Sequence, residues 1–188
     1  ADEVITGFGR TGDWTGSRHW GVRPDLMSTA KGITSGYLPF GAVMIADHVA
    51  EVFETAPATE AAIWHGYTYS AHPVCAAAAL KNIEIMEKEN LIERAAEIGA
   101  YFLETLKTLE EHPIVGEVRG RGLWLGIDFT TDKRTKEMFP MRRLASLVQR
   151  AQRKGLIIKL MGQALELAPP LVITKEEIDK GVKILHEC

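Results

Sequence analysis

The stretch that decides the fold is "IVGEVRGRGLWLGIDF", residues 114–129. Apolar and polar residues alternate along it, and it carries valine, isoleucine and aromatic side chains that favour strands. The pattern predicts either a pair of strands or one bent strand, and the sequence leaves these two possibilities open.

Two helices are predicted on the C-terminal side of this stretch. Residues 141–155, "MRRLASLVQRAQRKG", form an amphipathic pattern that ends at Gly155. In residues 174–187, "TKEEIDKGVKILHE", Thr174 stands at the N-cap and Glu177 at the capping-box position. Each segment therefore predicts one complete helix.

Strand-like runs lie between these helices. "LIIKLM", residues 156–161, and "ALELAPPLVI", residues 164–173, are separated by Gly162. Together with the neighbouring elements they give the order β-α-β-β-α, which predicts a compact α/β unit.

Residues 72–112, on the N-terminal side, have helical character. Pro73 stands near the start, where its missing N–H costs least, and Asn90 marks a break between two helices. Two apolar stripes recur at three- and four-residue spacing: Ala76, Leu80, Ile83 and Met86, then Leu91, Ala95, Ile98 and Phe102. We expect a domain boundary in a linking helix around residues 88–112, between domains 1–88 and 89–188.

Residues 1–47 are rich in loops and glycine. The short runs "ADEVI" (1–5) and "GAVMIA" (41–46) read as strands, the second of them buried. Because the sequence opens and closes inside predicted elements, we expect a fragment of a longer protein.

Composition narrows the function classes. Of 188 residues, 46% are hydrophobic and 25% charged, with a net charge of −3, so a nucleic-acid partner has no electrostatic support. No apolar run approaches the ~20 residues of a membrane span, and no signal-peptide pattern is present. Two cysteines, Cys75 and Cys188, give no disulfide framework, and Cys75 is expected to be a buried thiol. A cytoplasmic location is expected.

One motif indicates a nucleotide site only superficially. "GFGRTG" (7–12) matches G-x-G-x-x-G, but "DWTGSRHWG" follows it without helical periodicity, and the expected ribose-binding acid is missing. A nicotinamide-dependent enzyme is therefore disfavoured.

His65, His72 and Cys75 lie close together in sequence, but their spacing fits no standard zinc pattern, so we predict no metal site.

Lys31 stands out because it is the one charged residue between Leu26 and Ala46. In a dry site the neutral amine of a lysine becomes available as a nucleophile. An exposed loop lysine beside Gly32 explains the local composition equally well, so both interpretations stay open here.

Two further candidates accompany Lys31, and each has an alternative that stays open here: a strand-end acid that faces water, and an ordinary N-cap region. Asp2 and Glu3 end an apparent strand, where ligands bind in α/β sheets, and a buried acid there would need a cationic partner such as a protonated pyridine nitrogen. Thr68 and Ser70, in "HGYTYSAHP", precede a predicted helix, where hydroxyl and N–H groups favour an anion such as phosphate.

Taken in order, five segments resemble the class III aminotransferases, the fold-type-I pyridoxal 5'-phosphate family that includes ω-amino acid:pyruvate transaminases. They are "ADEVITGFGRTG", "PDLMSTAKGITSGYLPFGAVMI", "HGYTYSAHPVCAAAAL", "VRGRGLWLGIDF" and "APPLVIT". The resemblance implies an α/β fold: the C-terminal part of the cofactor-binding large domain in residues 1–88, then a small C-terminal α/β domain in 89–188. It also implies transfer of an amino group from an ω-amino acid or amine to a keto acid such as pyruvate.

The resemblance assigns roles to single residues. Lys31 matches the lysine that binds pyridoxal phosphate covalently, Asp2 the acid paired with the ring nitrogen, and Val4 the residue packed on the ring face. Thr68 matches a threonine that reaches the cofactor phosphate of the neighbouring subunit, which implies a homodimer with shared sites.

Lys159 departs from the family pattern, because ω-transaminases usually carry there an arginine that binds the substrate carboxylate. Lysine keeps the charge but loses the bidentate geometry. A solvent-facing Lys159 stays the alternative. An aminomutase, a decarboxylase or a non-catalytic fragment on the same scaffold also stay open, because the family's phosphate loop and ring-stacking aromatic residue do not occur in this sequence.

Overall fold

The computed structural model describes residues 1–57 and 59–188, and the chain separates into two compact units. Unit 1 comprises Ala1–Gly9 and Asp13–Ile92, and unit 2 comprises Arg10–Gly12 and Glu93–Cys188. Three residues near the start of the chain thus belong to the second unit, although their neighbours on both sides belong to the first.

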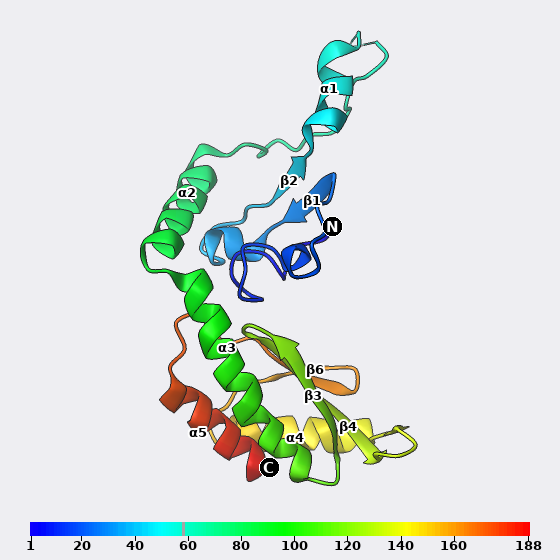
Figure 1. The fold of residues 1–188 in the computed structure, drawn as a ribbon, viewed down its shortest axis with the longest axis vertical. Helices are drawn as coiled ribbons and strands as arrows, with labels where there is room; N and C mark the ends of the chain where they lie inside the picture. Colours follow the sequence, from blue (N-terminus) through cyan, green and yellow to red (C-terminus); the bar gives the residue numbers. More distant parts are fainter. Residues whose placement is uncertain (58) are drawn as a thin grey trace. The chain divides into compact units, whose positions relative to one another are not determined.

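Unit 1 is built around a two-stranded antiparallel sheet, which Figure 1 shows with its strands side by side. Strand β1 (Leu26–Thr29) pairs with β2 (Ala42–Ile45), so that Leu26 faces Ile45 and Thr29 faces Ala42. The remaining elements are the 3₁₀ helices η1 (Gly16–Trp20) and η2 (Lys31–Thr34) and the helices α1 (Asp47–Thr55) and α2 (Pro73–Lys88).

Three expectations for this unit are wrong in detail. Residues 1–5 form no strand; Asp2 makes a single parallel bridge to Ser28 of β1. Strand β2 exists but is not buried, since Val43 is 63% exposed; β1 is the only described strand that pairs with it. On α2 the stripe through Leu80 is misplaced, because Leu80 is 69% exposed while Cys75, Ala79 and Met86 are buried.

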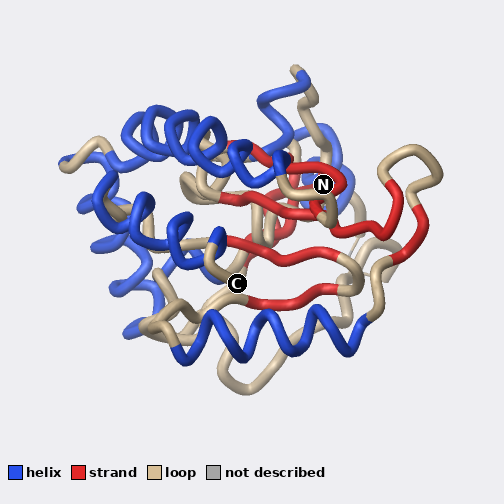
Figure 2. Tube along the Cα trace, turned by 90° about the horizontal axis from the view of Figure 1, so that it is seen from below, coloured by secondary structure: helices blue, strands red, loops and turns tan. Residues whose placement is uncertain are grey.

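Unit 2 is an antiparallel sheet with three α-helices. Its strands run in the order β3-β4-β7-β6, with β5 paired to the far end of β4, and Figure 2 shows strands side by side with helices along them. The elements in chain order are α3 (Leu91–Lys107, whose first two residues belong to unit 1), η3 (Thr108–Glu111), β3 (Val115–Arg121), β4 (Trp124–Asp132), β5 (Glu137–Met138), α4 (Met141–Arg153), β6 (Lys159–Met161), β7 (Ala164–Leu167) and α5 (Lys175–His186).

The stretch 114–129 forms two strands, so the strand-pair interpretation is confirmed. Strands β3 and β4 make a hairpin in which Arg121 faces Trp124. Alternate residues of β4, namely Leu125, Ile127 and Phe129, are buried in one core with side chains from α3, α4 and α5. This one-sided burial is what the period-two pattern predicts.

The predicted helix boundaries are also confirmed. Thr174 accepts the N–H of Glu177, and the Glu177 carboxylate accepts the N–H of Thr174, which completes the capping box of α5. Helix α2 begins at Pro73, and Asn90 takes a left-handed conformation (φ 51°) between α2 and α3. Gly155 ends the turn after α4 with φ 92°.

The second apolar stripe, from Leu91 to Phe102, is buried as predicted. A close approach accompanies it, because a Cβ added at Gly99 of α3 would lie 2.2 Å from the carbonyl oxygen of Gly122. Helix α3 therefore packs directly on the backbone of the β3–β4 turn. In the described part of the chain, no helix is both long and apolar enough to cross a membrane.

Candidate active site

Lys31 lies directly beyond the end of β1, as the first residue of the 3₁₀ helix η2. Its backbone is left-handed (φ 48°), which is uncommon for a residue with a side chain and costs free energy. The residue is exposed, and among the described residues its ammonium group has no ion-pair partner. The structure thus presents a free amine on a strained turn.

The turn that carries Lys31 is fixed on two sides. A Cβ at Gly32 would lie 2.9 Å from Cβ of Phe8, so the glycine allows the turn to pack against the loop of residues 7–8. On the other side the Asn82 side chain of α2 donates to the carbonyl oxygens of Gly32 (2.9 Å) and Ile33 (3.2 Å). Sequence reasoning missed Asn82; its one local signal is a weak helix former inside an alanine-rich helix.

Asp2 lies beside the same strand. It bridges Ser28 in parallel, and its Oδ1 atom accepts the backbone N–H of Val4 at 3.0 Å. The carboxylate is exposed and Val4 is half-buried. Asp2 and Lys31 thus both lie near the end of β1, Asp2 beside Ser28 and Lys31 two residues after Thr29. That Asp2, Val4 and Lys31 form one site stays a prediction.

Glu3, the neighbour of Asp2, is a buried acid with a different role, and sequence reasoning did not separate the two. Its carboxylate accepts the N–H groups of Gly16 (2.8 Å) and Ser17 (2.7 Å) and the hydroxyl of Thr6. Burial raises the pKa of the Glu3 carboxyl, but these hydrogen bonds outweigh burial and hold it below its ordinary value. Glu3 therefore fixes the loop that precedes β1.

Thr68 is not brought to this site by any described contact. It lies exposed in the loop before α2, inside a turn in which Ser70 and Tyr67 exchange two hydrogen bonds. Among the described residues, no hydrogen bond joins Thr68 to Asp2 or Lys31. Its role at a phosphate stays a prediction.

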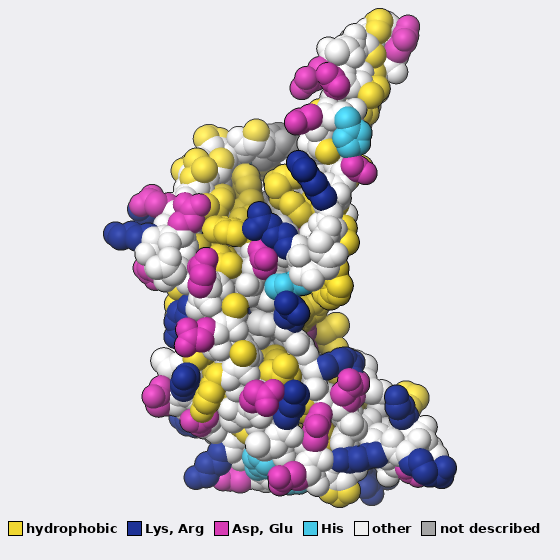
Figure 3. Space-filling model, viewed as in Figure 1, with side chains coloured by type: hydrophobic (Ala, Val, Ile, Leu, Met, Phe, Trp, Pro, Cys, Tyr) yellow, Lys and Arg dark blue, Asp and Glu magenta, His cyan; other side chains and the backbone are white. Residues whose placement is uncertain are grey.

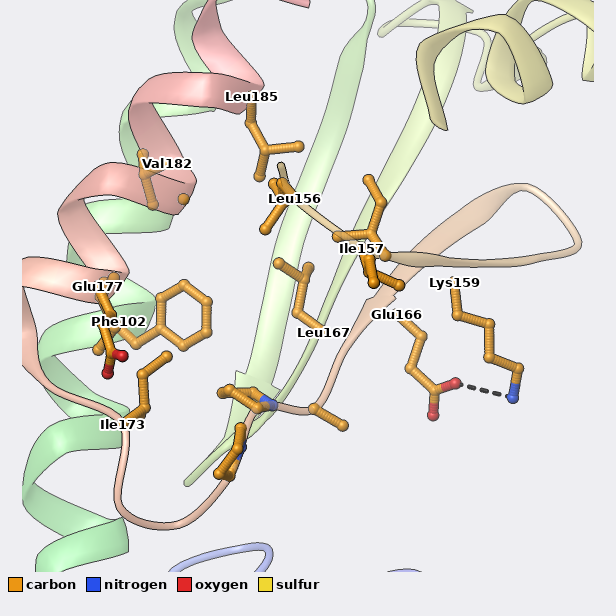
Figure 4. A pocket seen from close by; sticks show the side chains of 16 residues that line it. Phe102, Leu156, Ile157, Lys159, Glu166, Leu167, Ile173, Glu177, Val182 and Leu185 are labelled. Carbon is orange, nitrogen blue, oxygen red and sulfur yellow. Dashed lines mark ion pairs between the residues drawn. The ribbon is translucent and has the colours of Figure 1, made fainter. Parts of the chain in front are cut away.

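Lys159 belongs to unit 2 and is paired with an acid. Its Nζ atom lies 3.1 Å from Oε2 of Glu166, which faces it directly across the β6–β7 hairpin, and the Lys159 side chain is 68% exposed (Figure 4). Sequence reasoning missed Glu166, although a two-residue turn at Gly162 and Gln163 places residues 159 and 166 opposite each other. Lys159 is exposed, as the solvent-facing alternative expects, but it also forms an ion pair with Glu166.

Glu166 is held by more than Lys159. The indole N–H of Trp124 donates to its Oε1 atom at 2.7 Å and lowers the pKa of the carboxyl most; burial opposes this, and Lys159 and Arg10 lower it further. Arg10 donates to the carbonyl oxygens of Leu123 and Pro169, and burial lowers its own pKa. Glu166 is therefore ionised and firmly oriented at neutral pH.

Lys159 and Glu166 lie at one end of a groove of about 510 Å³ in unit 2. Its walls are largely apolar, and Glu177 lies at the other end (Figure 4). The side chains of Phe102, Leu167 and Val182 between the two ends belong to the core of the unit. The groove thus combines an apolar wall with one charged pair at its rim.

The two disfavoured alternatives gain no support from the geometry. Residues 4–12 form successive turns, and a short 3₁₀ helix rather than an α-helix follows them. Two glycines of this segment allow close packing instead. A Cβ added at Gly7 would lie 2.8 Å from the backbone carbonyl oxygen of Glu3, and one added at Gly12 would lie 2.8 Å from Cα of Ala96. Among the described residues, no group of three or more His, Cys, Asp or Glu could hold a metal ion.

The model of the class III aminotransferases (Aminotransferase class-III) matches residues 1–188. The chain is 42% identical over 190 residues to putrescine–pyruvate aminotransferase of Pseudomonas aeruginosa, covering 100% of this chain and 41% of that protein. It is 43% identical to diaminobutyrate–2-oxoglutarate transaminase of Halomonas elongata, covering 97% of this chain and 40% of that protein.

Solved structures agree. A thermostable (S)-enantioselective omega-transaminase from Thermomicrobium roseum superimposes with a TM-score of 0.92 at 45% identity, covering 99% of this chain and 41% of the other. An amine transaminase from an uncultivated Pseudomonas species, in its PLP-bound form, gives 0.94 at 42% identity, covering 98% and 42%. The chain thus spans about two fifths of the length of these relatives and has the fold of that part of a fold-type-I transaminase. This chain belongs to the class III aminotransferases.

Proposed function

We propose that this chain carries the lysine and the ring-nitrogen acid of a pyridoxal phosphate-dependent aminotransferase. The reaction moves an amino group from an ω-amino acid or amine to a keto acid, with pyruvate as the expected acceptor. The observation that supports the proposal is the position of two groups near the end of β1: a free amine on a strained turn, Lys31, and an acid, Asp2, bridged to Ser28.

The residues at the end of β1 fit this cofactor. The Lys31 amine is exposed, so it is available for a covalent bond to the cofactor aldehyde. Asp2 uses Oδ1 to accept the Val4 N–H, which leaves Oδ2 to face a ring nitrogen. Val4, half-buried beside Asp2, suits contact with a flat ring. In this proposal Lys31 binds the cofactor, Asp2 and Val4 contact its ring, and Thr68 reaches the phosphate bound by a second copy.

When bound, pyridoxal phosphate supplies an electron sink that stabilises negative charge at the substrate carbon. Lys31 acts as base and then acid: its freed amine takes a proton from the substrate carbon and returns one nearby. Asp2 keeps the ring nitrogen protonated through a charge-assisted hydrogen bond. The turn of η2 fixes the backbone from which the Lys31 side chain extends, which favours proton transfer by limiting where the amine can lie.

The test uses the full-length protein. With added pyridoxal phosphate, the wild type should show a visible absorption band and pyruvate-dependent amine consumption, and Lys31→Ala should lose both. Lys81→Ala removes an exposed lysine of α2 that pairs with Glu84, so it controls for lost surface charge and should keep both. Retention of the band and the activity in Lys31→Ala would remove the assignment.

Lys159 is proposed to bind the substrate carboxylate. Glu166 competes for its ammonium group at 3.1 Å, so a carboxylate substrate must displace or share that pair. We predict that Lys159→Arg improves kcat/KM for carboxylate substrates, because a guanidinium can bind Glu166 and a substrate at once. The control substrate is an amine without a carboxylate, whose steady-state constants should not change. Unchanged constants for the carboxylate substrates as well would exclude this role.

A homodimer and a cytoplasmic location belong to the same proposal. Aromatic side chains favour protein interfaces, and Tyr67 and Tyr69 on either side of Thr68 are 75% and 81% exposed. Figure 3 shows further hydrophobic side chains gathered on unit 1 between α2 and β2. Cys75 and Cys188 are free thiols, which suits a reducing compartment. Sedimentation of the full-length protein tests the dimer, and a monomer with full activity would exclude shared sites.

A further inference from the structure

We propose that Asn82 of α2 is a positioning residue for Lys31: its amide holds the left-handed turn from which the Lys31 amine projects. This inference rests on the proposed function, because it concerns how the cofactor-binding lysine is held. Nothing in the local sequence around Lys31 points to Asn82, which lies about 50 residues away along the chain.

The turn needs an external constraint. Lys31 (φ 48°) and Ser35 (φ 49°) are both left-handed although neither is glycine, and Gly36 follows at φ 75°. Such conformations persist only where the surroundings fix them. Within the turn, the backbone offers the N–H of Ser35 to the oxygen of Gly32 and the N–H of Gly36 to the oxygen of Lys31. Isolated 3₁₀ turns of this length are weak.

Asn82 supplies the constraint through both ends of its amide. The Nδ2 group donates to the carbonyl oxygens of Gly32 at 2.9 Å and Ile33 at 3.2 Å, while Oδ1 accepts the hydroxyl of Ser35 at 2.7 Å. Two carbonyl oxygens facing the nitrogen fix the orientation of the amide. One side chain thus ties three residues of the turn, Gly32, Ile33 and Ser35, to α2.

The helix that carries Asn82 is itself anchored. Met86 is 2% exposed, and α2 packs against η2, where Ile33 and Thr34 are buried. The turn also packs on the N-terminal loop, since Gly32 lies against Phe8. The Lys31 turn therefore packs on both a loop and helix α2, and the Asn82 amide supplies the hydrogen bonds that join the turn to α2.

The chemistry requires an amide at this position. Aspartate has nearly the same shape and could still accept from Ser35, but it cannot donate and would place a charge against two carbonyl oxygens. Alanine removes all three bonds to the turn, and also the contact of Nδ2 with the Met86 sulfur at 3.4 Å, without adding charge. Comparing Asn82→Asp and Asn82→Ala with Lys81→Ala, an exposed neighbour on the same helix, separates the amide from general effects on α2.

The first readout needs no cofactor. Hydrogen exchange of the peptide covering residues 31–36 is measured in the full-length apoprotein. Both Asn82 variants should exchange at Ser35 and Gly36 about tenfold faster or more, with Lys81→Ala unchanged. Unchanged exchange in both Asn82 variants would overturn the proposal.

The second readout follows Lys31 itself. Pyridoxal phosphate is added, the bond to Lys31 is trapped by borohydride, and the modified peptide is quantified against time and pH. The Asn82 variants should trap about tenfold more slowly and with a displaced pH midpoint. A variant with a lower melting temperature but wild-type trapping would show a merely structural role and overturn the proposal.

The two failures are distinguishable. If the wild type traps no cofactor at Lys31, the proposed function fails, whatever Asn82 does. If the wild type traps cofactor and the Asn82 variants match it in rate and pH midpoint, the proposed function stands and only the positioning role is lost.

Discussion

Glu3→Gln is the perturbation whose effect the structure defines most sharply. The wild-type carboxylate binds three donors: Oε2 accepts Gly16 N–H and the Thr6 hydroxyl, and Oε1 accepts Ser17 N–H. Glutamine has the same shape but one oxygen. If that oxygen replaces Oε2, the new NH₂ group faces the Ser17 N–H, which loses its acceptor.

The magnitude follows from these bonds. A hydrogen bond to a charged group contributes about 1.5–3 kcal/mol, and the two remaining bonds weaken because their acceptor becomes neutral. We therefore expect local destabilisation of about 3 kcal/mol, which corresponds to roughly 100-fold faster opening of this loop. Hydrogen exchange at Gly16 and Ser17 in the full-length protein measures it directly.

The same substitution changes the pH dependence. The pKa of Glu3 is lowered in the folded protein from an ordinary value of 4.5, so its stabilising effect is complete above that value and is lost as pH falls through the lowered pKa. Wild-type protection should thus fall in acid, after correction for intrinsic exchange, while the Gln variant stays flat. Glu51→Gln, in an exposed position of α1, is the control. Protection within threefold of wild type in Glu3→Gln would refute the reasoning.

Three further substitutions test the packing of unit 2 and the cap of α5 by chemical denaturation of the full-length protein. Gly99→Ala should destabilise the protein by more than about 2 kcal/mol, because the new Cβ would lie 2.2 Å from the Gly122 backbone. The control is Gly181→Ala on α5, where the nearest atom is 3.7 Å away; it should be neutral or stabilise by up to about 1 kcal/mol. Equal effects of the two substitutions would contradict the close approach. Thr174→Ala should cost about 1 kcal/mol through loss of the bond to Glu177, and an unchanged midpoint would show that the cap is not needed.

Sequence patterns predicted the fold best where side chains differ strongly in size. The stripe from Leu91 to Phe102 stands out against charged neighbours, so its buried face could be read directly. Residues 75–79 are all small, and a stripe there is ambiguous by one residue, which turns the predicted face by 100°. That ambiguity explains the misplaced Leu80.

The candidate site was predictable only in part, for a different reason. Lys31 is conspicuous because its neighbours are uncharged, and Asp2 was identified by its place at an apparent strand end. Glu3 accepts backbone N–H groups 13 and 14 residues away, and Asn82 donates to a carbonyl oxygen 50 residues away. No local sequence pattern predicts partners at such separations. The resemblance to the family pointed to the residues assigned to the cofactor, but not to those that hold them.

The assignment of Arg10–Gly12 to unit 2 has a consequence for folding and for cleavage. Arg10 binds the carbonyl oxygen of Leu123, 113 residues along the chain, and Leu123 returns its N–H to the Arg10 oxygen. Closing a loop of that length costs about 4 kcal/mol of chain entropy, so unit 2 is complete only after this distant segment docks. A protease cut at Asn90 would therefore not yield two whole modules, because the C-terminal product would lack a piece of its own fold.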